Sequence, residues 1–217
     1  EFVFALPRPL NFTAGQYLEW TLPHPKADQR GIRRYFTIAS APSESALRLA
    51  VKMVEGGSTF KSAMKELTPG QLLFATARAG DFVLTETDAS YLFIAGGIGV
   101  TPFISHIRSA LATGKSLNAI LLYACKSEDD VAYRSLFEEV ATLGVHMIPI
   151  LSDPSDQWSG ERGFITAEML QRLVPDYQDR RAYISGPPAM VNAYTVLLKK
   201  NGVRNSAIKT DYFPGLA

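Results

Sequence analysis

Apolar and polar positions alternate along the first part of the chain in the way that is typical of half-buried strands. Leu47, Leu49, Val51 and Met53 are apolar, and the positions between them are small or charged. Five short apolar segments separated by turn-forming residues are predicted to be strands, at 16–22, 34–39, 47–54, 71–77 and 82–84. A helix is predicted at 59–67. Short strands at this spacing indicate a small antiparallel β-barrel or sandwich.

The second part alternates between apolar strands and amphipathic helices. The predicted strands lie at 91–95, 119–124, 145–151 and 182–185. Helical patterns follow the first, second and fourth of these strands. This order predicts an α/β domain with a doubly wound parallel sheet. We therefore expect two domains, an antiparallel β-barrel at 1–88 and an α/β domain at 89–217, joined by a short polar stretch.

The charge balance argues against nucleic acid as a partner. The chain has 217 residues, with 22 Lys and Arg against 21 Asp and Glu, and no basic run. The longest apolar stretch, 91–104, is interrupted by three glycines and a proline and is too short to span a membrane. We expect no membrane span within this chain.

Cys125 is the single cysteine. One thiol cannot form an internal disulfide or hold an iron–sulfur cluster, so any cluster must lie on another protein or in another part of this one. The first residues, Glu1 to Phe4, have the pattern of a strand interior and lack an initiator Met. We expect the chain to be a piece of a longer polypeptide.

The sharpest local signal is the segment AGGIGVTP at 95–102, which follows an apolar strand and opens a helix. Its glycines permit a tight turn, and free amides at a helix start bind a diphosphate well. Thr101 is suited to cap that helix and Pro102 to occupy its first position. The alternative is a tight strand-to-helix turn without a ligand.

Two weaker signals lie in the first part. The segment RRYFTIAS at 33–40 combines arginines, aromatics and a hydroxyl on a predicted strand, which suits binding of a phosphate and a ring together. The segment GGST at 56–59 precedes a short helix and offers a second anion site. An ordinary barrel strand and an ordinary capped loop are the alternatives.

Taken in order, these segments resemble the motifs of the ferredoxin–NADP reductase family. RYFT at 34–37 is similar to its R-x-Y-[ST] flavin motif, with Phe36 in place of tyrosine. GGST resembles its G-x-x-[ST] segment, and GGIGVTP resembles its G-G-x-G-x-T-P dinucleotide loop. SGPPAM at 185–190 is similar to its C-G-P-x-x-M segment, and DYF at 211–213 matches its final acidic and aromatic residues. The resemblance covers nearly the whole chain.

The resemblance implies FAD as cofactor. By it, Arg34 pairs with the FAD diphosphate, Phe36 lies against the isoalloxazine and Thr37 forms a hydrogen bond near N5. The residues implied to bind FAD are Arg34, Phe36, Thr37, Val51, Lys52, Gly57, Ser58 and Thr59, with the backbone of Ala50 also at the polar edge of the flavin ring. Catalytic roles are implied for Thr37, for Ser185, which replaces the family's usual cysteine, and for Phe213, which covers the flavin until nicotinamide displaces it.

The resemblance also implies a nicotinamide dinucleotide as hydride donor. The residues implied to hold it are Gly97, Gly99, Thr101, Pro102, Ser152, Asp153, Gly186, Pro187 and Met190. A carboxylate such as Asp153 repels a 2′-phosphate and accepts hydrogen bonds from ribose hydroxyls, which favours NADH over NADPH. Lys126 favours the opposite choice, and Asp153 has an alternative role as the start of a turn. The three histidines are scattered, so no metal site is predicted.

Together these implications describe a flavin-dependent oxidoreductase that takes hydride from NAD(P)H and passes electrons to a separate iron–sulfur, haem or flavin acceptor. We expect a cytoplasmic location, or the cytoplasmic face of a membrane if a membrane region is fused to this chain. Two alternatives remain open: a non-catalytic docking domain that binds flavin or dinucleotide without turnover, and a reductase of free flavin.

Overall fold

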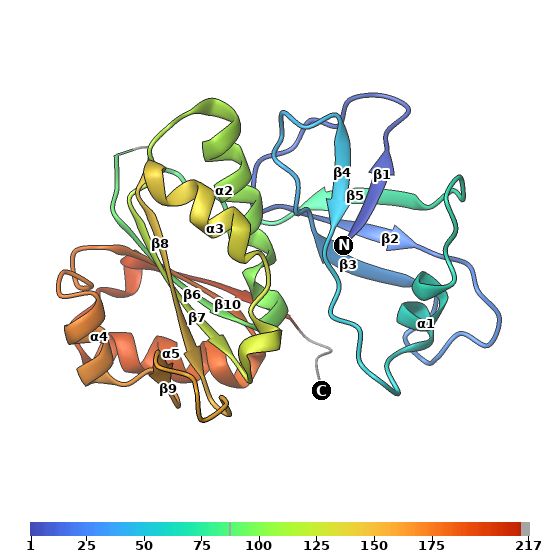
Figure 1. The fold of residues 1–217 in the computed structure, drawn as a ribbon. Helices are drawn as coiled ribbons and strands as arrows, with labels where there is room; N and C mark the ends of the chain where they lie inside the picture. The colour runs from blue at the N-terminus through green and yellow to red at the C-terminus, as the bar shows by residue number, and fades with distance from the viewer. Residues whose placement is uncertain (87, 214–217) are drawn as a thin grey trace.

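The N-terminal part of the protein is built from antiparallel strands. The computed structural model describes residues 1–86 and 88–213. In one sheet β1 (Phe2–Ala5) pairs with β4 (Ala46–Leu49), and in the other β2 (Tyr17–Thr21) lies between β3 (Arg33–Thr37) and β5 (Phe74–Ala79). A bridge between Ile38 and Leu49 joins the two sheets, and α1 (Thr59–Lys65) packs beside them (Figure 1). This is the expected antiparallel barrel.

Alternation along the strands directs one face of each sheet into a shared core. Leu18 and Trp20 of β2, Leu49 of β4, and Phe60 and Met64 of α1 are all buried in it. The strand predicted at 47–54 is shorter in the structure and ends at Leu49.

The C-terminal part contains a six-stranded parallel sheet. Its strand order is β11 (Ile208–Tyr212), β10 (Arg181–Gly186), β6 (Tyr91–Gly96), β7 (Ala119–Cys125), β8 (Val145–Leu151) and β9 (Glu161–Arg162). Figure 1 shows α2 (Thr101–Thr113) and α3 (Arg134–Val140) on one face, with α4 (Ala167–Leu173) and α5 (Pro188–Lys200) on the other. The doubly wound sheet expected from the sequence is therefore present.

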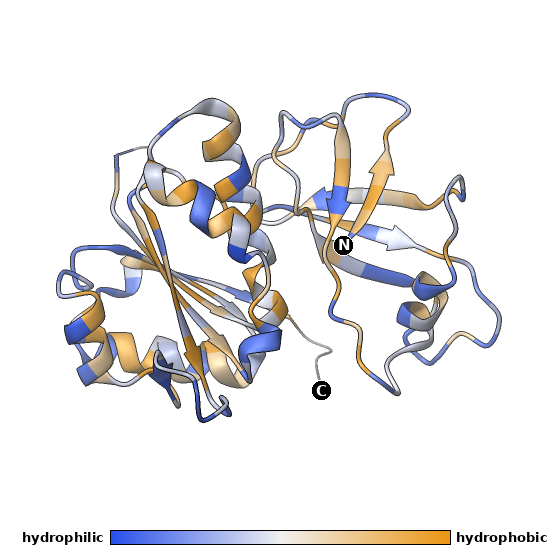
Figure 2. Ribbon diagram, in the orientation of Figure 1, coloured by the Kyte–Doolittle hydropathy of each residue, from blue (hydrophilic) through white to orange (hydrophobic). Residues whose placement is uncertain are grey.

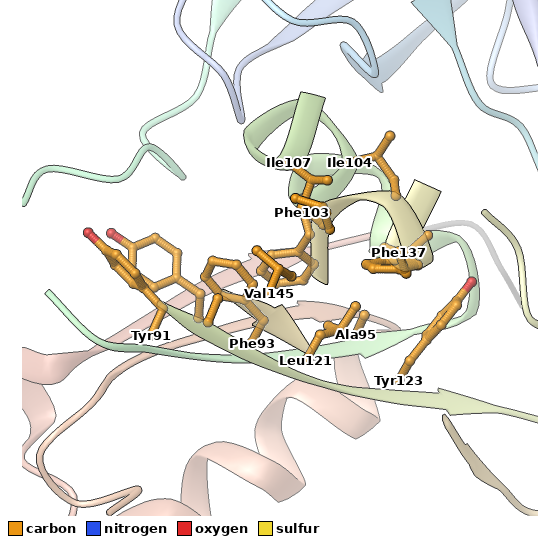
Figure 3. Close-up of a cluster of buried hydrophobic side chains, with 14 of the residues drawn as sticks. Tyr91, Phe93, Ala95, Phe103, Ile104, Ile107, Leu121, Tyr123, Phe137 and Val145 are labelled. Atoms are coloured by element: carbon orange, nitrogen blue, oxygen red, sulfur yellow. The ribbon is translucent and has the colours of Figure 1, made fainter. Parts of the chain in front are cut away.

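Two apolar cores enclose this sheet. On the first face, Phe93 of β6 and Leu121 of β7 pack beneath Phe103 and Ile107 of α2 (Figure 3). Every residue of β6 is buried, as expected for a central parallel strand. Figure 2 shows the same division, with apolar strands inside and polar residues on the outer sides of the helices.

The stretch 82–84, which the sequence predicts as a strand, connects the two parts without strand pairing. Phe82 is buried against Phe103 and Tyr183, at ring-centroid distances of 5.5 and 5.0 Å. The apolar residues of this stretch are therefore explained by packing between the two parts and not by a strand. No helix within the described residues has both the length and the apolar character needed to cross a bilayer.

Candidate functional site

A cavity of about 550 Å³ lies where the N-terminal part meets the loops at the carboxyl ends of β6 and β11. Its wall includes six of the residues predicted to bind FAD: Arg34, Phe36, Thr37, Val51, Lys52 and Ser58. Thr101 and Phe213 also line it. We call this cavity the first pocket. Its volume is in the range of sites for large organic ligands.

Arg34 is anchored from several sides. It is only 8% exposed, and its Nη2 donates to both carboxylate oxygens of Asp28 at 2.8 and 3.0 Å. Its Nη1 donates to the backbone carbonyls of Arg30, Gly31 and Arg33. Its Nε is buried and has no hydrogen-bond partner among the described residues. A phosphate oxygen would satisfy this donor, so Arg34 fits an anionic cofactor.

The first pocket is rich in positive charge. Besides Arg34, its wall contains Arg30, Arg33 and Lys61, while Asp211 is the single carboxylate among the described residues that line it. Burial lowers the pKa of Lys61, and the nearby Arg30 lowers it further. A diphosphate would relieve this concentration of cations, and the wall therefore fits FAD.

The segment at 56–59 contributes less than the sequence indicates. Ser58 lines the first pocket and caps α1, accepting a hydrogen bond from the backbone amide of Lys61. Gly57 and Thr59 do not line it. The Thr59 hydroxyl instead accepts from the Asp28 amide at 3.0 Å and lies 3.0 Å from His24 Nε2. Thr59 thus holds the loop that positions Arg34.

Aromatic rings surround the first pocket. Phe36 packs against buried Phe60 at 5.8 Å, and Tyr17 meets Tyr35 edge to face at 5.5 Å. Tyr17 and Tyr35 line the pocket, although the sequence interpretation did not select them. The sequence did contain a signal for Tyr35: side chains two positions apart on a strand share a face, so Tyr35 lies on the same face as Thr37, which was predicted to bind FAD.

The carboxyl ends of β10 and β11 bring two polar residues next to each other. Ser185 is directly opposite Asp211 in the parallel register. Burial is the main cause that raises the pKa of Asp211; a backbone hydrogen bond opposes it and nearby Asp81 adds to it, and together they bring the pKa to about 6. Ser185 is fully buried, and its hydroxyl has no hydrogen-bond partner among the described residues. The Phe213 amide donates to the Gly186 carbonyl, which ties the end of the described chain to β10.

A second pocket of about 400 Å³ lies at the carboxyl ends of β6, β7 and β10. Four of the residues predicted to hold the dinucleotide line it, together with Lys52 of the predicted FAD set; the four are Gly97, Ser152, Pro187 and Met190. Lys52 and Ile98 line both pockets, so the two are adjacent. The strand order reverses between β6 and β10, and ligands of open α/β sheets bind at such a switch point.

The glycines of the 95–102 segment have different roles. Gly97 has φ +50°, and a Cβ there would point into open space. A Cβ on Gly99 would lie 2.4 Å from the Ser185 carbonyl oxygen, so this glycine permits the loop to pack on β10. Gly97 thus leaves room for a ligand, as a dinucleotide loop requires.

Thr101 does not cap α2, contrary to the sequence prediction. It is the first residue of the helix and Pro102 the second, because a 3₁₀ turn at Gly97–Val100 leads directly into α2. The Thr101 hydroxyl donates to the Ile98 carbonyl at 2.7 Å. Pro102 is buried and lines neither pocket.

The second pocket also contains residues that the sequence interpretation did not select as binding residues. Phe164 offers an aromatic face that is 74% exposed. Cys125 lines the wall, and burial raises the pKa of its thiol to about 11, which disfavours the thiolate form that reacts as a nucleophile. Asp153 lies off the wall, 3.7 Å from the Lys126 ammonium at the surface. Within the described residues no group of His, Cys, Asp or Glu is arranged to hold a metal.

Lys52 also joins the two parts of the molecule across the pockets. Its ammonium donates to a carboxylate oxygen of Asp130 at 2.7 Å. This hydrogen bond lowers the pKa of Asp130. Lys52 therefore forms an ion pair between the two parts and also contributes a positive charge to the walls of both pockets.

Two family models match the chain. An oxidoreductase FAD-binding domain matches residues 1–83, and an oxidoreductase NAD-binding domain matches residues 93–195. Ferredoxin–NADP reductase B of Sorangium cellulosum is 35% identical over 182 residues, which cover 82% of this chain and 71% of that protein.

Other similar proteins are longer. The phenol hydroxylase P5 protein of Acinetobacter pittii is 31% identical over 96% of this chain, and this chain spans 59% of that protein's length. A solved cytochrome P450 reductase from Amycolatopsis is 30% identical, with a TM-score of 0.84 over 97% of this chain and 64% of that one.

Proposed function

The chain belongs to the ferredoxin–NADP reductase family, and from this premise we propose that it is the reductase part of a longer or multi-component electron-transfer system. It binds FAD in the first pocket and a reduced nicotinamide dinucleotide in the second. The chemistry that FAD supplies is acceptance of a hydride at N5 and release of its electrons to an acceptor.

The observation that carries this proposal is the adjacency of two unlike pockets. The first has a cationic, aromatic wall, and the second lies at the switch point of the parallel sheet. Lys52 and Ile98 belong to both walls, so ligands in the two pockets come into contact there. Hydride transfer requires such contact.

Residues of this chain have distinct roles in the proposal. Arg34 holds the diphosphate, and Thr37, at the end of β3, orients the flavin through its hydroxyl. Ser185 is fully buried and lines neither pocket, so in this proposal it supports the nicotinamide site from behind its wall, at the carboxyl end of β10 opposite Asp211. Phe213 covers the flavin in the absence of nicotinamide. The domain division remains the predicted one, with FAD bound by 1–88 and the dinucleotide mainly by 89–217.

The decisive experiment is anaerobic reduction of the purified chain. We expect a yellow protein whose flavin absorption is bleached by NADH. Thr37→Ala is expected to slow bleaching more than it weakens FAD retention, because the hydroxyl orients the flavin while the diphosphate contacts remain. Protein that stays colourless after incubation with FAD would refute the function. Bound flavin that neither NADH nor NADPH reduces would instead support a docking domain.

NADH is the proposed donor because Asp153 follows β8 near the second pocket. Its carboxylate suits ribose hydroxyls and repels a 2′-phosphate. We expect Asp153→Ser to narrow the preference for NADH over NADPH by about tenfold, which corresponds to about 1.4 kcal/mol. For each donor, the limiting rate of flavin bleaching is divided by the donor concentration that gives half of that rate. The ratio of these two values, NADH to NADPH, measures the preference. An unchanged ratio would assign Asp153 to the turn alone.

The proposed acceptor is a separate oxygenase component or ferredoxin-type protein. The relatives named a phenol hydroxylase protein and a ferredoxin–NADP reductase are the support for this choice. Reduced nicotinamide dinucleotide is supplied in the cytoplasm, and we propose that compartment for the reaction. Reduction of a plant-type ferredoxin and of an oxygenase component in parallel assays would distinguish the two acceptors.

A further inference from the structure

Helix α2 connects the two pockets through one rigid element. The turn that precedes it carries Ile98, which lines both pockets, and its first residue, Thr101, lines the first pocket. One turn later Ser105 and then Arg108 reach across to the N-terminal part. The helix thus carries the dinucleotide loop at one end and an interdomain contact in its middle.

The residues that α2 contacts follow directly from the flavin strand. Ser105 is fully buried, and its hydroxyl donates to the Ser40 carbonyl at 2.7 Å. Arg108 Nη1 donates to the Ala39 carbonyl at 3.0 Å. β3 ends at Thr37, which lines the first pocket, so the contacted residues lie two and three positions beyond it.

The same short segment is held from its other side by β4. The Ala39 amide donates to the Arg48 carbonyl at 2.9 Å, and the Arg48 amide donates to the Ser40 hydroxyl. Residues 39–40 are therefore clamped between β4 and α2. A displacement of α2 would be transmitted to the end of β3.

Arg108 is itself fixed in place. Its Nη2 donates to Glu1 at 3.1 Å, and the other carboxylate oxygen of Glu1 accepts from Arg48 at 3.0 Å. Its guanidinium lies over the ring of Tyr133, 5.7 Å from the centroid. The Arg108 side chain is 17% exposed and that of Arg48 is 33% exposed, so the network is partly shielded from water. A side chain held at this many points is suited to define an orientation.

We propose that Ser105 and Arg108 are positioning residues that set the separation between the dinucleotide and the flavin for hydride transfer. The inference rests on the proposed function. In that reaction the C4–H bond of the dihydronicotinamide breaks and an N5–H bond forms, and both electrons move from nicotinamide to flavin. Reacting atoms must approach to about 3–3.5 Å, and a displacement of about 1 Å costs on the order of 100-fold in rate. Two domains are expected to move relative to each other unless their interface is large and hydrophobic, and the contacts of Ser105 and Arg108 restrict such motion.

The test compares the FAD-loaded wild type with Ser105→Ala, Arg108→Ala and Arg108→Lys. We expect the limiting rate of anaerobic bleaching by NADH to fall about tenfold or more in the two alanine variants. FAD retention and the NADH concentration for half-maximal rate should change by less than about threefold, because neither side chain lines a pocket. The long-wavelength absorbance that arises when nicotinamide stacks on flavin should weaken in parallel. Arg108→Lys should recover part of the rate, since it keeps one charged donor.

Two matched variants serve as controls. Ser109→Ala removes a hydroxyl from the same helix that, among the described residues, forms no hydrogen bond to the N-terminal part. Arg172→Ala removes an arginine whose paired carboxylate, Glu161, lies within the C-terminal part. Both should retain the wild-type rate. Without flavin, amide exchange at residues 38–41 should accelerate in the Ser105 and Arg108 alanine variants and stay unchanged in these controls.

Two results would overturn the inference. One is an unchanged limiting rate and stacking absorbance in the Ser105 and Arg108 variants. The other is a rate that falls only in proportion to lost FAD, which would show a purely structural role. A wild type that NADH does not reduce would refute the proposed function instead, so the two failures are distinguishable.

Discussion

Arg34 illustrates what a motif reveals about a single residue and what it leaves out. The resemblance identifies an arginine at the flavin site, and the structure places Arg34 on the wall of the first pocket. No sequence pattern indicates that both carboxylate oxygens of Asp28 accept hydrogen bonds from Nη2 of Arg34, because that contact depends on the path of the loop before β3. Asp28 is therefore a positioning partner that the sequence does not reveal.

We expect Arg34→Ala to weaken FAD binding by roughly 10- to 100-fold, the equivalent of one or two charge-assisted hydrogen bonds. Bleaching of the flavin that remains bound should slow much less. Asp28→Asn should weaken FAD binding to a smaller extent, since the guanidinium keeps its three carbonyl partners. Fluorescence of released FAD measures both effects. Equal affinity in wild type and Arg34→Ala would remove Arg34 from the diphosphate site.

Asp211, which lines the first pocket, makes the stability of the folded protein depend on pH. Its pKa is raised from 3.8 to about 6 by burial, so the folded protein holds a proton that the unfolded chain releases. The folded state is therefore favoured below pH 4 and loses this advantage as pH rises through 6. We expect Asp211→Asn to raise the free energy of unfolding at pH 8, by up to about 3 kcal/mol, and to change it little at pH 4. Denaturant unfolding of both proteins at both pH values tests this, and a difference independent of pH would contradict it.

Elements are predictable where they are long and apolar. β6, β7, β8 and β10 appear within about two residues of their expected bounds, because buried parallel strands form continuous apolar runs. α4 is not predicted from the sequence, although it is as long as the predicted helices α1 and α3, and β11 is not predicted because three of the five residues in its sequence, IKTDY, are polar. The family motif nevertheless identified the end of β11, which carries Asp211 into the first pocket.

Substitution of Gly97 tests whether the turn before α2 binds the dinucleotide. A side chain there meets no atom within 4 Å, so Gly97→Ala costs only the positive φ, about 1 kcal/mol. Gly114, at the end of α2, has φ +64° and equally open surroundings, which makes Gly114→Ala a matched control. We expect both variants to lose similar stability in thermal unfolding, whereas only Gly97→Ala weakens binding of NADH. Equal NADH affinity in the two variants would show that the dinucleotide does not approach Gly97.

At the scale of the whole molecule, the sequence predicts two parts and their order but not how they meet. The contacts that join them, such as Ser105 to Ser40 and Lys52 to Asp130, link single residues far apart in the chain. Isolated polar contacts leave no periodic pattern. The adjacency of the two pockets therefore becomes visible only in the structure.

Removal of FAD should destabilise the whole molecule. A ligand present at 100 times its dissociation constant stabilises the folded state by about 2.7 kcal/mol. For a chain of this size, that corresponds to a fall in melting temperature of roughly 5 to 11 °C when the flavin is stripped. Added FAD should restore it, and calorimetry of stripped and reloaded protein measures the change. Identical melting temperatures would mean that the first pocket does not hold FAD.

The position of β6 at the centre of the parallel sheet also has a consequence for synthesis of the protein. β6 pairs with β7 on one side and with β10 on the other, and Arg181 of β10 is about 90 residues beyond its partner Tyr91. At ribosomal speeds this interval takes roughly 5 to 18 s. During that time the apolar β6 has one unpaired edge, which is a template for association with other chains. We therefore expect the nascent chain to be most prone to association with other chains until β10 has emerged and paired with β6.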